Sequence, residues 1–144
     1  MNPSRILPDL QCSLVCEDVR QEVTGNFILI GVISHLRVAQ LPVTAFKLLL
    51  FNRWAAGFGE FRETARLIAP DQTTVLRQVE AKFALRDVTH NVTNVSFWGQ
   101  IKFEVAGAYY FEVSVDDVMK LRFPLVISLV TPEPPAEGGA RKFP

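Results

Sequence analysis

Residues 75–85 read VLRQVEAKFAL, and the period of this stretch decides the fold class. Apolar and polar side chains alternate along it and on to residue 86, with Val75, Val79, Ala81, Phe83 and Leu85 on one face and Gln78, Glu80, Lys82 and Arg86 on the other. Because successive side chains of a β-strand point to opposite faces, this alternation predicts a strand with one buried face. Arg77 is the only interruption of the apolar face.

The same period of two recurs elsewhere along the chain. Residues 95–105, VSFWGQIKFEV, put their odd-numbered side chains on an apolar face and Trp98 on the other. Turn signals at residues 70–72 (PDQ) and at Asp116 and Asp117 predict two hairpins. No stretch of ten residues keeps a 3.6-residue apolar stripe, so little helix is expected. We therefore predict an all-β fold, a two-sheet antiparallel β-sandwich of about eight strands, immunoglobulin-like or jelly-roll-like.

Two stretches are apolar on both faces. Residues 27–33 read FILIGVI, and residues 46–51 read FKLLLF with Lys47 as the only polar side chain. Central strands of a sheet show this pattern because both of their faces are covered. The second face of residues 46–51 must therefore be covered either by another element of the chain or by a partner.

Length and composition predict one domain followed by a tail. The chain has 144 residues, 49% of them apolar, which supplies a core without disulfides or metals. Residues 132–144, PEPPAEGGARKFP, are rich in proline and glycine and do not suit a packed core. We predict a β-sandwich domain over residues 1–131 and a C-terminal tail over residues 132–144.

The charge balance argues against nucleic acid as a partner and favours another protein. Fifteen basic residues match fifteen acidic ones, so the formal net charge is zero. Without a block of basic residues, electrostatic capture of nucleic acid is not expected. A net charge near zero also removes self-repulsion, which favours association with a protein partner or with further copies of the chain.

Three features predict a cytoplasmic protein. The first ten residues lack a basic segment followed by an apolar one, so we expect no secretory signal. The apolar run at residues 123–130 is interrupted by Pro124 and Ser128 and is shorter than the roughly 20 residues of a membrane span. Cys12 and Cys16 would lie about 13 Å apart on one strand, beyond disulfide reach, so we predict two buried, reduced thiols.

Candidate catalytic and metal-binding residues are few. His35 and His90 are the only histidines, and without a recognisable partner spacing each is expected to have a surface or loop role. Asp116 and Asp117, with Glu112 nearby, carry oxygens that a calcium ion could use, but an ordinary hairpin turn explains the two aspartates more simply. The sequence predicts no catalytic residue, no cofactor, no metal ligand and no enzymatic activity.

A candidate interaction surface comes from apolar and aromatic side chains, namely Phe46, Leu48, Leu50, Phe51, Trp54, Trp98 and Tyr110. Trp98 and Tyr110 fall on the outward faces of strands that are expected to be neighbours. Either they form an exposed aromatic patch that marks a binding surface, or Trp98 packs under a loop or a crossing strand.

Three segments resemble an uncharacterised bacterial family of domains of unknown function: CEDVR at 16–20, FILIGVI at 27–33 and GAYYFEV at 107–113. The resemblance covers about residues 10–130. It implies a β-sandwich and brings with it no catalytic or binding residue.

The sequence thus favours a binding or assembly module that forms a homo-oligomer or binds a protein partner. One alternative is a sandwich that binds a small ligand, or a carbohydrate on a platform formed by Trp98 and Tyr110. Another alternative is an enzyme whose site lies in the loops around His90 or Trp54.

Overall fold

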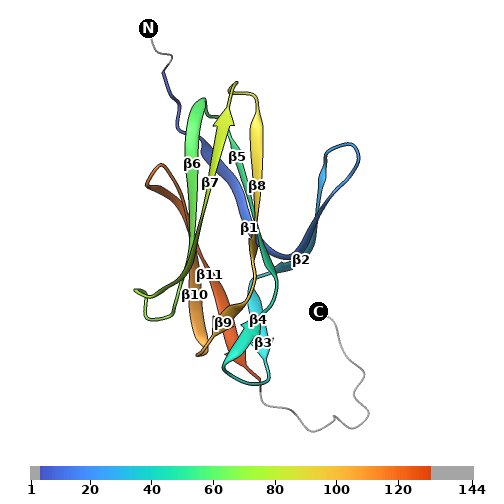
Figure 1. Cartoon of the computed structure of the whole chain (residues 1–144), viewed down its shortest axis with the longest axis vertical. Helices are drawn as coiled ribbons and strands as arrows, with labels where there is room; N and C mark the ends of the chain where they lie inside the picture. Colours follow the sequence, from blue (N-terminus) through green and yellow to red (C-terminus); the bar gives the residue numbers. More distant parts are fainter. Residues whose placement is uncertain (1–3, 131–144) are drawn as a thin grey trace, which may run out of the picture.

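The computed structural model describes residues 4–130, and the secondary structure of this part is entirely β (Figure 1). Its eleven strands are β1 (Asp9–Gln21), β2 (Phe27–Ile33), β3 (His35–Val38), β4 (Val43–Ala45), β5 (Leu48–Ala55), β6 (Gly59–Ile68), β7 (Val75–Leu85), β8 (Asn91–Trp98), β9 (Ile101–Phe103), β10 (Gly107–Val115) and β11 (Val118–Leu129). The all-β prediction is confirmed, although eleven strands replace the expected eight. The tail predicted at residues 132–144 lies outside the described residues.

The strands form three sheets instead of the expected two. One sheet has the order β2-β1-β5-β8, a second has the order β3-β11-β10-β6-β7, and β4 pairs with β9 alone. All pairings are antiparallel except that of β3 with β11. Figure 1 shows the β4–β9 pair at one end of the two larger sheets. The predicted hairpins are present as β6–β7 and β10–β11.

The core lies between the two larger sheets. Trp98 of β8 meets Phe111 of β10 edge-on, with ring centroids 5.1 Å apart. A second cluster stacks Trp54 of β5 on Phe83 of β7, with centroids 5.5 Å apart. Both clusters join residues of the two sheets, so aromatic packing holds the sheets together.

The continuous strand expected at residues 95–105 is interrupted, and this changes the face that is buried. β8 ends at Trp98 and β9 begins at Ile101 in another sheet, and Gln100 between them has a φ of 58°. Trp98 is therefore fully buried whereas Phe97 is 60% exposed, the reverse of the predicted faces. For β9 the predicted faces are correct, because Ile101 and Phe103 are buried.

β2 is an edge strand of its sheet, not the central strand that its apolar run predicts. Its Phe27 ring contacts the Phe51 ring of β5 edge-on at a centroid distance of 5.5 Å. The second face of β5 is thus covered by an element of the same chain. Gly31 in β2 has a φ of 64°, and a Cβ there would lie 2.6 Å from the Glu17 side chain, so this position favours glycine.

Candidate functional site

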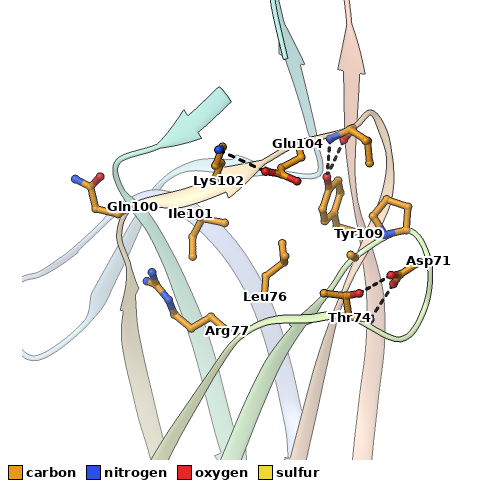
Figure 2. Close-up of a pocket in the computed structure, with 12 residues that line it drawn as sticks. Asp71, Thr74, Leu76, Arg77, Gln100, Ile101, Lys102, Glu104 and Tyr109 are labelled. Atoms are coloured by element: carbon orange, nitrogen blue, oxygen red, sulfur yellow. Dashed lines mark hydrogen bonds and ion pairs between the residues drawn. The ribbon is translucent and has the colours of Figure 1, made fainter. Parts of the chain in front are cut away.

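A cleft of about 490 Å³ opens beside the first residues of β7 (Figure 2). Its walls come from the β6–β7 turn and β7 on one side and from β9 and the residues around it on the other. The apolar part of the lining consists of Ala69, Pro70, Leu76, Ile101, Val105 and Tyr109. Four charged side chains, Asp71, Arg77, Lys102 and Glu104, complete the site together with Thr74 and Gln100.

A β-bulge positions two of the lining side chains. Leu67 of β6 pairs with Arg77, but the next pair is Ile68 with Val75, which leaves Leu76 as an extra residue on β7. Leu67 belongs to the core, and directly opposite residues share a face of the sheet, so Arg77 lies on the core-facing side. The bulge therefore lets both Leu76 and Arg77 line the cleft.

The two cations of the cleft differ in their surroundings. Lys102 on β9 forms an ion pair with Glu104 at 3.4 Å. Arg77 takes part in none of the ion pairs or side-chain hydrogen bonds found among residues 4–130, and Figure 2 draws it on the wall opposite Lys102. Among the described residues, the guanidinium of Arg77 is thus the cation of this cleft that has no counter-ion.

The remaining polar groups of the cleft already have structural roles. The Tyr109 hydroxyl donates to the Val105 carbonyl at 2.7 Å, and burial raises the pKa of Tyr109. Asp71 accepts hydrogen bonds from the Thr74 hydroxyl and from the backbone amides of Thr74 and Thr73, which lower the pKa of Asp71 to about 2. These contacts engage both groups within the fold.

The structure buries five of the seven residues of the predicted interaction surface: Leu48, Leu50, Phe51, Trp54 and Trp98. None of the five side chains is more than 4% exposed, so the free chain does not present them. Phe46, which is 70% exposed, and the half-buried Tyr110 are accessible. The Arg122 guanidinium lies 4.0 Å from the centroid of the Tyr110 ring, so no flat platform of Trp98 and Tyr110 exists.

Comparison with known protein families gives a match over residues 11–128 to a family of unknown function (DUF6941). The chain belongs to this family. The predicted resemblance to an uncharacterised family is thereby confirmed. Comparison with curated proteins gives no match.

The histidines and the paired aspartates of this DUF6941 domain are far from one another in the fold. The His35 ring Nε2 lies 2.6 Å from the Ser128 hydroxyl, and His90 lies in the β7–β8 loop. Asp116 and Asp117 form the β10–β11 turn with positive φ values, and Asp116 accepts a hydrogen bond from the Arg62 amide at 2.8 Å. Among residues 4–130, no group of three or more His, Cys, Asp or Glu side chains is arranged to hold a metal.

Both cysteines are free thiols, as predicted. Cys16 is buried and Cys12 is half-buried, and burial raises the pKa of both. Over the same described residues, no helix is long and apolar enough to cross a membrane.

A buried polar cluster joins the two larger sheets, and the sequence analysis did not identify it. Glu63 of β6 is 1% exposed, and its Oε1 accepts hydrogen bonds from Trp54 Nε1 at 2.6 Å and from Asn94 Nδ2 at 3.2 Å. Ser13 donates to the Oδ1 of the fully buried Asn52. The sequence does carry a signal for the buried position of Glu63. Side chains alternate between the two faces of a strand, so the pattern that places the polar neighbours of Glu63 on the outward face places Glu63 on the inward face.

Proposed function

We propose that this domain is a non-enzymatic binding module that takes an extended, acidic and apolar segment of a protein partner into the cleft beside β7. The observation that carries the proposal is Arg77, a cation held on the core-facing side of β7 above an apolar floor. A carboxylate is the natural counter-ion of a guanidinium, and apolar side chains suit the floor.

The position of β7 favours an extended segment. β7 is the last strand of its sheet and forms a ladder only with β6. It also contacts β8, to which it is not paired, so the backbone groups of its outer edge lack strand partners among the described residues. Val75 and Leu76, at the beginning of β7, are both exposed. Domains that bind extended peptides use such edges, where main-chain hydrogen bonds add to the contacts of alternate side chains.

The experiment is selection from a displayed library of random short peptides on the immobilised full chain. We expect enriched peptides to combine a carboxylate with apolar residues, and Arg77→Glu to weaken their binding at least about tenfold, because one charge-assisted pair is lost. Arg86→Glu is the matched control, since Arg86 is an exposed arginine near the other end of β7. A library without enrichment, or peptides equally sensitive to Arg86→Glu, would contradict the proposal.

We also propose that the chain self-associates, and this proposal rests on two exposed aromatic side chains. Phe46 is 70% exposed and Phe97 is 60% exposed. The Phe97 ring lies near the backbone of Phe46, because a Cβ at Gly99 would lie 2.4 Å from the Phe97 ring and 3.2 Å from the Phe46 carbonyl oxygen. Exposed aromatic side chains of this kind are typical of contacts between protein subunits.

We expect the wild-type chain to form a dimer at micromolar concentration, and Phe97→Lys to convert it to a monomer with unchanged strand content. Light scattering coupled to size exclusion measures the mass, and circular dichroism measures the fold. Phe51→Lys is unsuitable for this purpose, because Phe51 is buried and a lysine there would destabilise the fold. A monomeric wild type would remove the self-association part and leave peptide binding at the β7 cleft as the function.

We further propose a cytoplasmic location, which suits two free thiols.

A further inference from the structure

A second cleft, of about 390 Å³, lies between the tip of the β1–β2 hairpin and β5. Its apolar lining comes from Phe27 and Leu29 of the hairpin and from Phe51 of β5. Its polar lining comes from Arg53, Asn91 and the turn residues 25–26. None of the described residues that line this cleft carries a carboxylate, and Arg53 is the only charged group among them.

Arg53 is incompletely paired. Its Nη2 donates to Asn91 Oδ1 at 3.0 Å, whereas its Nε is closed off from solvent and has no hydrogen-bond partner among the described residues. The residues opposite Arg53 on the adjacent strands are Cys12 and Thr93, both uncharged at neutral pH. None of the ion pairs in residues 4–130 includes Arg53.

A half-buried guanidinium without a counter-ion is unfavourable unless an anion or water completes its surroundings. We propose that this cleft binds a small monocarboxylate with a flat apolar body, the carboxylate on the outer nitrogens of Arg53 and the body against Phe27 and Leu29. A single positive charge matches a carboxylate better than a phosphate, which carries nearly two negative charges at neutral pH.

This site is independent of the peptide cleft beside β7. Arg53 alternates along β5 with the buried Asn52 and Trp54, so its side chain lies on the face of the sheet that is turned away from the core. Arg77, in contrast, lies on the core-facing side of the other large sheet. A negative result at one site therefore leaves the proposal for the other intact.

The experiment is an NMR titration of the full chain with sodium benzoate at constant ionic strength. We expect saturable shifts confined to the hairpin tip and the neighbouring part of β5. Benzamide, which has the same shape without the charge, and inorganic phosphate, which has the charge without the apolar body, should each bind at least about tenfold more weakly. If phosphate binds as tightly as benzoate, the site is a general anion site and the assignment to carboxylates is overturned.

Two pairs of variants separate binding from folding. Arg53→Met should abolish the benzoate shifts, whereas Arg20→Met removes an exposed charge from the same hairpin and should leave them. Leu29→Glu places a tethered carboxylate in the cleft and should block benzoate, while Leu29→Gln is the uncharged control. If Arg53→Met does not fold, the comparison of Leu29→Glu with Leu29→Gln still tests whether benzoate binds in this cleft. Benzoate binding that survives Leu29→Glu, or the absence of saturable shifts in the wild type, would overturn the proposal.

Discussion

Replacing Phe111 with alanine is expected to lower the free energy of unfolding by about 3–5 kcal/mol, the largest effect among the substitutions considered for this chain. Phe111 is fully buried at the centre of β10. Its ring meets Trp98 edge-on and stacks on Phe123, with centroids 5.6 Å apart in the second pair. Alanine leaves a cavity that the surrounding strands cannot fill, because each is held by its own ladder of hydrogen bonds.

Urea unfolding followed by circular dichroism measures this loss, with Met119→Ala as the control. The control also truncates a large apolar side chain to alanine, but Met119 is 55% exposed and lies outside the proposed dimer contact, so its cost should stay within about 1 kcal/mol. The loss of about 3–5 kcal/mol expected for Phe111→Ala is a large share of the roughly 5–15 kcal/mol by which domains are stable. The Phe111→Ala chain should therefore be partly unfolded near body temperature. Similar losses for both variants would contradict the assignment of Phe111 to the core.

The second largest effect is expected at the buried cluster around Glu63. Trp54→Phe removes the indole N–H that donates to Glu63 Oε1 at 2.6 Å and leaves only the Asn94 donor at 3.2 Å. Leaving a buried polar atom short of a partner costs about 1–3 kcal/mol, and the smaller ring adds a packing loss, so about 2–4 kcal/mol in total is expected.

A double-mutant cycle with Glu63→Met isolates the hydrogen bond from the packing. In the Glu63→Met background the indole has no carboxyl to bind, so Trp54→Phe should cost at least about 1 kcal/mol less than in the wild type. Chemical denaturation of the four chains gives the coupling energy. Equal costs of Trp54→Phe in both backgrounds would mean that the Trp54–Glu63 contact contributes nothing to stability.

The two arginines on which the binding proposals rest are not equally visible in the sequence. Arg77 interrupts an otherwise apolar face of a strand, and this is a signal that alternation alone reveals. Arg53 has no such signal, because it follows the apolar run of β5 at a position where an exposed charge would be ordinary. Arg53 lines a cleft together with Phe27, a residue 26 positions earlier, because the β1–β2 hairpin brings the Phe27 ring to Phe51 of β5.

The sequence by itself determined the β content and the β6–β7 and β10–β11 hairpins. These properties are local, because alternation and turn chemistry act between residues a few positions apart. Only the tertiary structure decided that β2 is an edge strand and that residues 95–105 divide between two sheets at Gln100. It also decided that a bulge brings Leu76 and Arg77 into one cleft. A positive φ or a bulge shifts the parity of every later side chain, and whether the backbone adopts one depends on distant strands that pair with it.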